Sequence, residues 1–276
     1  MRCIRLPAVQ NVNTNNRASL RLPLGSTYEK IYFLLGTNIL QSLITNIVLR
    51  INNKEFIRWN SAADMQAMLS YKTNASGTSY LVFDFTEIRA RDEVAMKLGT
   101  IAACAEAGVQ DFVIEFDLGT YVQVAGSTIT AFADIEAPSA NPIIQRIQVQ
   151  QRSIASATTE QIFVPFGMNG YQIKRLMIKH ANVASIRVRR DGVDFFEDLP
   201  LALMNQRMID FGRVPQAGYF MMDFMPDTLQ SNSFNTAQVV VGGKPVPVAN
   251  LDIRVTTSAA DTLTVYTESY SLNSQL

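Results

Sequence analysis

The sequence predicts an all-β protein with short helical insertions, folded as a tandem double jelly roll of two eight-stranded antiparallel β-sandwiches. Its 276 residues are 47% hydrophobic, which is enough for one large or two ordinary cores. Short alternating runs of Val, Ile, Phe and Tyr recur between Gly, Pro, Asn and Ser, as is typical of strands and turns. The second half repeats these runs in the order of the first, which indicates an internal duplication.

The repeat is clearest in "YLVFDFTE" (80–87) and "YFMMDFMPD" (219–227), which both place Asp-Phe after Tyr and three apolar residues. The same offset of 139 positions carries Met65 onto Met204 and "VLRINN" (48–53) onto "RVRRDG" (187–192), a strand followed by a turn dipeptide. The offset drifts at the ends, where Tyr28 is matched with Tyr171 and "TITAFADI" (128–135) with "TLTVYTES" (262–269). Because the order never changes, insertions in loops explain the drift.

Strands this short cannot bury a core as one flat sheet, whereas about eight of them in two facing sheets can. In the first half, strands are expected near 17–23, 28–35, 46–51, 54–59, 79–86, 110–118, 120–125 and 127–136. In the second half, they are expected near 160–166, 171–179, 184–190, 193–197, 217–225, 250–257 and 261–271.

Helices are expected where the alternation breaks. Ser61 is a suitable N-cap for a helix over 61–69, and its counterpart covers 199–212. A second helix is expected only in the first half, over 90–108, with an apolar face and Gly108 as its C-cap. That face consists of Val94, Leu98, Ile101 and Ala105. The corresponding segment 227–249, with Gly242-Gly243, is predicted to be a long loop.

The duplication predicts a first jelly roll over 1–137, a crossover linker over 138–157 and a second jelly roll over 158–276. The linker contains Ile143, Ile144, Ile147 and Val149, so we expect it to pack against the protein and not to act as a flexible tether.

Composition and the N-terminal segment bear on whether the protein binds nucleic acid or lipid and whether it is exported or spans a membrane. Lys plus Arg equals Asp plus Glu at 24 each, so the chain has no general attraction for nucleic acid or anionic lipid. The first ten residues lack the apolar core of a signal peptide. The uncharged stretch 31–49 is matched by a charged one in the second half, which favours strand, loop and strand over a membrane span. Cys3 and Cys104 are expected to be free thiols.

The residue pattern offers little catalytic chemistry. His180 is the only histidine, which excludes a cupin-type metal site and favours a partly exposed structural role. Glu115 and Asp117 alternate on one strand as in some glycosidases, but the third carboxylate is missing, and a solvent-facing row of acids is the simpler interpretation. We therefore expect no catalytic and no cofactor-binding residues, and not an enzyme.

Nucleic-acid binding is similarly weakly supported. Arg187 and Arg189 form the densest basic run, but Asp191 and Asp194 lie close by, which favours a salt-bridged face over a phosphate groove. Trp59 is the only tryptophan, so no stacking platform is visible.

Two segments carry a resemblance to a known family: "RASLRLPLGSTYEKIYFL" (17–34) and "ITNIVLRINNKEF" (44–56). The chain resembles the major capsid protein of tailless, icosahedral, membrane-containing bacteriophages, most closely the corticovirus type. The resemblance implies a structural protein of the virion, whose homotrimers form pseudo-hexameric capsomers of a shell around an internal lipid membrane.

The same resemblance implies the partners. These are neighbouring capsomers, penton and minor membrane-associated capsid proteins and, weakly through Arg2 and Arg5, the underlying membrane, with no specific nucleic acid. The protein would occupy the host cytoplasm before assembly, and segments 90–108 and 227–249 would be tower loops or trimer contacts. A structural divalent cation such as calcium is compatible with this picture, although its ligands are unknown. The alternatives are a carbohydrate-binding or glycan-depolymerising β-sandwich protein and a scaffold subunit of a non-viral assembly.

Overall fold

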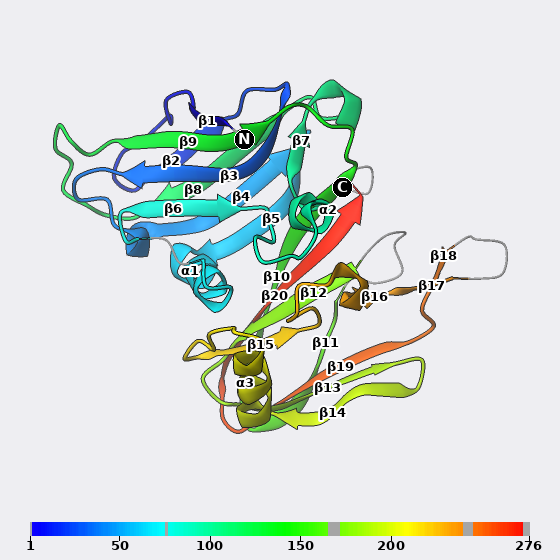
Figure 1. The fold of residues 1–276 in the computed structure, drawn as a ribbon. Coiled ribbons are helices and arrows are strands. Elements are labelled where there is room, and N and C mark those ends of the chain that lie inside the picture. The colour runs from blue at the N-terminus through cyan, green and yellow to red at the C-terminus, as the bar shows by residue number, and fades with distance from the viewer. Residues whose placement is uncertain (1, 75–76, 165–171, 240–244, 273–276) are drawn as a thin grey trace. The chain divides into compact units, whose positions relative to one another are not determined.

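The computed structural model describes residues 2–74, 77–164, 172–239 and 245–272 (Figure 1). The chain divides into two compact units. The first comprises residues 1–70, 74–148 and 272–276, and the second comprises residues 71–73 and 149–271. Strands dominate both units, which confirms the predicted all-β class with short helices.

The first unit is an eight-stranded sandwich of two antiparallel sheets. One sheet has the order β1 (Arg2–Arg5), β9 (Ile129–Glu136), β3 (Ser26–Leu35) and β6 (Tyr80–Asp84). The facing sheet has the order β5 (Lys54–Ser61), β4 (Ile44–Ile51), β8 (Phe112–Leu118) and β2 (Arg17–Arg21). A short ninth strand, β7 (Ile101–Ala103), extends the first sheet beside β3. Of these strands, β1 was not expected from the sequence.

The second unit repeats this order strand for strand. One sheet has the order β10 (Ile143–Ile154), β20 (Asp261–Leu272), β12 (Gln172–Lys179) and β15 (Tyr219–Asp223). The facing sheet has the order β14 (Val193–Pro200), β13 (Val183–Arg190), β19 (Leu251–Thr257) and β11 (Thr158–Ile162). The short strand β16 (Phe234–Asn235) pairs with β12 as β7 pairs with β3. The tandem double jelly roll is therefore confirmed.

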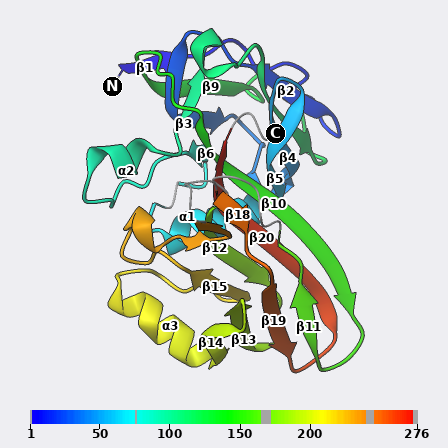
Figure 2. The ribbon, with the colours of Figure 1, turned by 90° about the vertical axis from the view of Figure 1, so that its right-hand side faces the viewer.

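Both helices expected at equivalent places are present. Helix α1 (Ala62–Tyr71) follows Ser61, whose Oγ accepts a hydrogen bond from the Asp64 amide at 3.2 Å, as predicted for an N-cap. Helix α3 (Leu201–Asp210) packs against β13, β14 and β15 (Figure 2). Its Met204 and Met208 side chains are buried. Each helix leads into the Tyr-led strand that first revealed the repeat.

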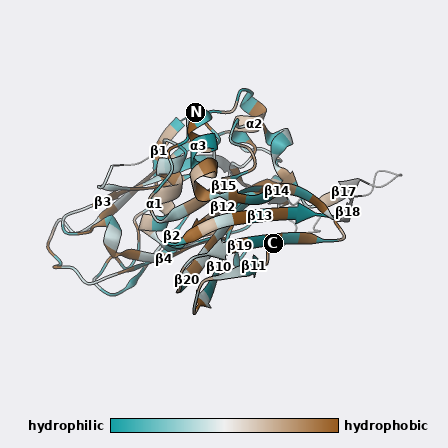
Figure 3. Cartoon of the chain, turned by 90° about the horizontal axis from the view of Figure 1, so that it is seen from below, coloured by the Kyte–Doolittle hydropathy of each residue, from teal (hydrophilic) through white to brown (hydrophobic). Residues whose placement is uncertain are grey.

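The core of the first unit lies between its sheets and is rich in aromatic rings. Phe33 on β3 meets Phe116 on β8 edge to face at 5.6 Å, and Tyr28 meets Phe112 in the same way at 5.8 Å. The core of the second unit also contains aromatic pairs, among them Phe224 and Phe234 with ring centres 4.8 Å apart. Hydrophobic and hydrophilic residues alternate along β13 and β19, as the colours of Figure 3 show.

The helix expected over 90–108 is wrong. Only Glu93–Lys97 form a helix, α2, and Ala105–Ala107 form the 3₁₀ turn η2, which ends at Gly108 with φ +75°. Between them, Ile101–Ala103 pair with Ser26–Tyr28 of β3. Hydrogen bonds at a sheet edge thus override a weak helical pattern that Gly99 already interrupts.

The strand expected over 120–125 is also wrong. Its amide and carbonyl groups bind side chains: Tyr121 N–H donates to Thr14 Oγ1 at 3.1 Å, and Val122 C=O accepts from Asn38 at 2.8 Å. Val122 is 74% exposed, so the alternating pattern here does not reflect a buried face.

The predicted loop over 227–249 contains more structure than expected. It holds the 3₁₀ turn η3 (Gln230–Asn232), strand β16, and a hairpin of β17 (Ala237–Val239) and β18 (Pro245–Pro247). Gly242-Gly243 lie outside the described residues.

Two expectations concern the connections between strands. Residues 31–49 form β3, the 3₁₀ turn η1 (Gln41–Leu43) and β4, as predicted for strand, loop and strand. No helix in the described part of the chain is long and apolar enough to cross a membrane. The expected linker 138–157 contains β10, and the proposed boundaries at 137 and 158 stay predictions.

Candidate functional site

The acidic pair singled out in the sequence is ion-paired. Arg17 binds Asp117 at 2.8 Å and Glu115 at 3.1 Å, Arg50 also binds Glu115, and Asn46 donates to Asp117 at 2.8 Å. Both carboxylates are half-buried among these donors. Because both carboxylates are engaged in ion pairs, the arrangement fits a structural network on β8.

The basic run on β13 is a salt-bridged face, as predicted. Asp194 on β14 accepts from Arg189 at 2.8 and 2.9 Å and lies 3.3 Å from Arg187. The hydrogen bond from Arg189, together with that from Arg187, lowers the pKa of Asp194 to about 2. Asp191 lies in the following turn, where its carboxylate accepts from the Asn250 amide at 2.9 Å.

His180 is buried and not partly exposed as expected. The Nδ1 atom accepts a hydrogen bond from the Asn182 backbone amide at 3.0 Å, in the turn that directly follows β12. An accepting Nδ1 places the proton of the neutral ring on Nε2. This hydrogen bond therefore gives His180 a structural role in the turn after β12.

The thiols and acids do not form a metal site in the part of the chain that the structure describes. Cys3 is exposed and Cys104 is buried, both as free thiols. Within the described ranges, no group of three or more His, Cys, Asp or Glu side chains could hold an ion.

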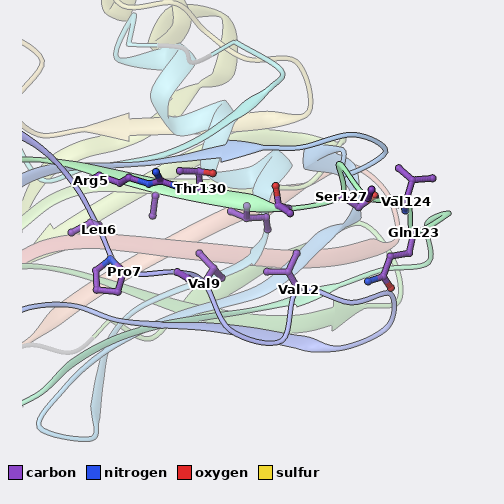
Figure 4. Close-up of a pocket in the computed structure, with 14 residues that line it drawn as sticks. Arg5, Leu6, Pro7, Val9, Val12, Gln123, Val124, Ser127 and Thr130 are labelled. Carbon is purple, nitrogen blue, oxygen red and sulfur yellow. Dashed lines mark hydrogen bonds between the residues drawn. The ribbon is translucent and has the colours of Figure 1, made fainter.

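A groove of about 720 Å³ separates the N-terminal segment from β9 and the preceding loop (Figure 4). Val9 and Val12 line one side, and Gln123, Val124 and Thr130 line the other. Arg5 is the one ionisable side chain among its described lining residues, so these supply no acid–base pair.

The most distinctive polar feature occurs at equivalent β-bulges of the two units. In the first unit, the register of β3 against β9 shifts between Tyr28 and Lys30. Lys30 is aligned with Asp84 on β6 and with Asp134 on β9, and its amine lies 3.0 Å from the Asp84 carboxylate. We call Glu29, Lys30, Asp84 and Asp134 the first bulge cluster.

The second unit has the same cross-strand arrangement. The register of β12 against β20 shifts between Ile173 and Arg175, and Arg175 is aligned with Asp223 on β15 and Glu268 on β20. Its guanidinium binds these carboxylates at 2.8 and 3.0 Å. We call Lys174, Arg175, Asp223 and Glu268 the second bulge cluster.

The two clusters differ in burial. The Lys30 side chain is 20% exposed, whereas that of Arg175 is 1% exposed. Two further amines, those of Lys72 and Lys174, lie 2.8 Å from Glu268. The Tyr71 hydroxyl donates to Asp223 at 3.1 Å, and burial, followed by the Asp223 charge, raises the pKa of Tyr71.

The bulged residue itself has the opposite charge in the two units. Burial and then the charge of Glu136 raise the pKa of Glu29. Lys97 lies 3.6 Å from Glu29 and 2.6 Å from Glu136, and its hydrogen bond lowers the pKa of Glu136. Lys174 takes the place of Glu29 in the second unit.

The alignment of the two halves of the sequence matched the acidic residues of these clusters, but it did not match Lys30 with Arg175. Asp84 and Asp223 share the offset of 139, and Asp134 and Glu268 occupy the same place in the matched segments 128–135 and 262–269. The registers make Ile173 the counterpart of Tyr28, because Tyr28 faces Ile135 and Ile173 faces Ser269. The match of Tyr28 with Tyr171, which lies outside the described residues, was two positions out.

Family models match both units. The model for the viral coat protein P2 N-terminal domain matches residues 3–136, and that for the viral coat protein P2 C-terminal domain matches residues 143–273. The chain belongs to the viral coat protein P2 family. The resemblance seen in the sequence is thereby confirmed, and this P2-family chain is a structural capsid protein of a virion, not an enzyme.

Individual relatives agree with the family. The major capsid protein P2 of Pseudoalteromonas phage PM2 is 22% identical over 224 residues, which are 80% of this chain and 82% of that protein. Its crystal structure matches with a TM-score of 0.84 at 17% identity, covering 98% of this chain and 97% of the other. A chain in the atomic structure of Sulfolobus Turreted Icosahedral Virus shares the fold at a TM-score of 0.65 and 11% identity, covering 98% and 90% of the two chains.

Proposed function

We propose that this P2-family protein forms homotrimers that act as pseudo-hexameric capsomers of an icosahedral shell around an internal lipid membrane. The supporting observation is the strand-for-strand duplication, with the same sheet orders in both units. Three copies bring six rolls of one architecture together, so a threefold assembly can fill a six-neighbour position in a lattice.

Differences between the rolls support the same proposal. Six identical rolls would give a capsomer no orientation, whereas one half-open and one buried bulge cluster per chain make the two rolls distinguishable to their neighbours. Sequence divergence on a shared frame thus provides the specificity that a lattice requires.

The proposed partners beyond the trimer are neighbouring capsomers, penton proteins, minor membrane-associated proteins and the membrane. Arg2 and Arg5 are exposed on β1, and each would contribute about 1 kcal/mol near an anionic surface. Such an attraction is weak, so shell contacts and not lipid binding would hold the capsomer in place. Before assembly, the protein would reside in the host cytoplasm.

A structural divalent cation such as calcium remains part of the proposal as a link between copies. Carboxylates from two chains would then complete one ion site, because calcium takes six to eight oxygen ligands. Chelation with EDTA should weaken association between capsomers, and unchanged association would argue against such an ion.

Light scattering on the purified full chain tests the central claim. A trimer would have three times the monomer mass of 30.7 kDa, and negative-stain images should show pseudo-hexagonal particles. A monomer or a twofold dimer at capsid-forming concentrations would contradict the proposal. The measurement needs no ligand, since the interfaces of a stable trimer bury large areas by themselves.

A further inference from the structure

Two strands at sheet edges carry exposed charges of opposite sign. On β1, at an edge of the first unit, Arg2 and Arg5 are exposed. On β14, at an edge of the second unit, Glu197 and Asp198 are exposed. Within the residues that the structure describes, none of these four side chains forms a hydrogen bond or an ion pair. Each edge therefore has charge available for a partner of the opposite sign.

Both edges can also accept a further strand. An edge strand presents a row of backbone N–H and C=O groups that have no neighbouring strand. In the described part of the chain, β1 pairs only with β9, and β14 pairs only with β13. Strand β14 also exposes apolar surface, since Val193 is 62% and Phe195 is 43% exposed. Backbone groups, apolar side chains and charge thus occur together on β14.

The first unit shows what covers the equivalent edge. Strand β5 is the counterpart of β14 at the offset of 139 positions. Residues 143–148, the first half of β10, belong to the first unit, and Ile147 is paired there in parallel with Ile57 of β5. Ile57 is 2% exposed, whereas its counterpart Phe196 is half-buried. Within the described residues, β14 lacks the covering strand that β5 has.

The covering strand has a counterpart of its own, which is β1. Strand β10 pairs with β20 as β1 pairs with β9, so β1 and β10 are the opening strands of the two rolls. Because one opening strand covers the edge of β5, the other is the segment that fits the edge of β14. Supplied by a second copy, β1 would repeat between chains the edge pairing that β10 makes in the first unit.

We propose that β1 of one copy pairs in parallel with the outer edge of β14 of a second copy, an inference that rests on the proposed trimer. Arg2 and Arg5 then lie beside Glu197 and Asp198, because neighbouring strands are only about 4.8 Å apart. Each copy gives one β1 and receives one on β14. Such a head-to-tail contact can close into a ring of three. Anionic lipid is the alternative partner of these arginines, and the experiments below distinguish the two.

The exposed thiol of Cys3 on β1 allows a direct test, because Cys104 is buried. Phe195→Cys, Phe196→Cys and Glu197→Cys each place a further thiol on β14. The spacing of paired strands falls within the Cα separation of about 4.4–6.8 Å that a disulfide spans. After mild oxidation with oxidised glutathione, at least one of these variants should migrate as a covalent trimer on a non-reducing SDS gel.

Two controls establish which thiols have reacted. Cys3→Ser, added to each β14 variant, should abolish the covalent trimer. Thr159→Cys places a thiol on β11, at the opposite edge of the same sheet, and should give no crosslink with Cys3. The absence of covalent trimers from all three β14 variants would overturn the inference.

A charge swap tests the ion pairs. Arg5→Glu places a carboxylate beside Glu197, and like charges across an interface weaken association. We expect at least about a tenfold rise in the concentration of half-trimerisation, measured by light scattering across a dilution series. Adding Glu197→Arg should restore most of the loss. Adding Glu106→Arg instead, on the exposed turn η2, restores the same net charge and should not recover the trimer. Equal recovery by both would overturn the inference.

The outcomes separate this inference from the proposed function. If the unaltered protein is monomeric, both fail. If it is trimeric and Arg5→Glu leaves the trimer stable but reduces flotation with vesicles of phosphatidylcholine and phosphatidylglycerol, the arginines bind lipid and only the docking inference fails. If covalent trimers form through Cys3 and the charge swap recovers association, the inference stands.

Discussion

The two bulge clusters show how one backbone feature supports two different electrostatic environments. At Lys30, the amine binds Asp84 with a fifth of its side chain in contact with water. At Arg175, the guanidinium binds two carboxylates and is almost completely buried. Surface pairs contribute about 0–1 kcal/mol, whereas breaking a buried pair costs about 3–5 kcal/mol because a charge is left unpaired.

The second cluster is a closed network on a covered face, whereas the first is partly open to water. Glu268 accepts hydrogen bonds from Lys72 and Arg175, and the Lys174 amine lies 2.8 Å from the same carboxylate. In the first cluster, Lys30 stays in contact with water, and the buried Asp134 accepts a hydrogen bond from Tyr32 at 2.8 Å. Burial and charge pairing therefore changed together.

The largest expected effect comes from Arg175→Met. The substitution leaves Asp223 and Glu268 buried with one cation fewer, and we expect the free energy of unfolding to fall by about 3–5 kcal/mol. Lys30→Met, its counterpart, should cost about 1 kcal/mol or less. Urea denaturation at one fixed protein concentration, followed by circular dichroism, measures both, and equal losses would contradict the comparison.

A smaller effect is expected from Lys72→Met, which removes one of the three cations on Glu268. A hydrogen bond to a charged group contributes about 1.5–3 kcal/mol, and the remaining two cations still neutralise the carboxylate. Trp59 is buried in the first unit, so its fluorescence reports that unit, and circular dichroism reports both. The variant should shift the circular dichroism transition more than the fluorescence transition. Lys179→Met, at the exposed end of β12, is the matched control.

Substitution of the bulged residue Glu29 is expected to stabilise the protein, in contrast to the substitutions above. Because the folded-state pKa of Glu29 is raised, its ionisation destabilises the fold as pH increases through that pKa. Glu29→Gln should therefore stabilise the protein at pH 7, and the gain should vanish below the unfolded-state pKa of about 4.3. Thermal melts at pH 7 and pH 3.5 compare the two proteins, and a loss of stability at pH 7 would show that Lys97 outweighs burial.

The smallest effect is expected at the half-buried ion pair between β13 and β14. The folded-state pKa of Asp194 is about 2, below an unfolded value of about 3.9, so its contribution is present above pH 3.9 and is lost as pH falls through 2. Asp194→Asn should lower the melting temperature slightly at pH 7. Near pH 2, the difference from the unaltered protein should have shrunk to about half or less. A difference of the same size at both pH values would implicate packing instead of charge.

The positions of most strands and of helix α1 could be predicted from the sequence because they depend on local residue patterns. Alternating runs such as 110–118 and the Tyr-led strands at 80 and 219 place strands by themselves, and Ser61 places a helix start. Both sheet orders then follow from the jelly-roll solution to burying such strands.

The sequence could not show the bulge clusters because a bulge is a property of strand pairing. Lys30 and Arg175 are 145 positions apart, which no offset in the sequence comparison aligned. A slip of two residues keeps every side chain on its own face, so the hydrophobic pattern is the same before and after it. The helix prediction over 90–108 failed for a related reason. Ile101–Ala103 are extended because they pair with β3, which lies far away in the sequence.

The equal spacing of the two copies from Ala62 to Leu118 and from Leu201 to Thr257 has a consequence for engineering and for gene history. A chain that passes directly from Tyr80 to Phe220 would omit 139 residues and still contain one complete set of eight strands: β1 to β5 of the first copy with β15, β19 and β20 of the second. Unequal recombination within this region would add or delete a whole roll in frame. Equal spacing in this region therefore makes one whole roll the unit by which such an exchange changes the chain.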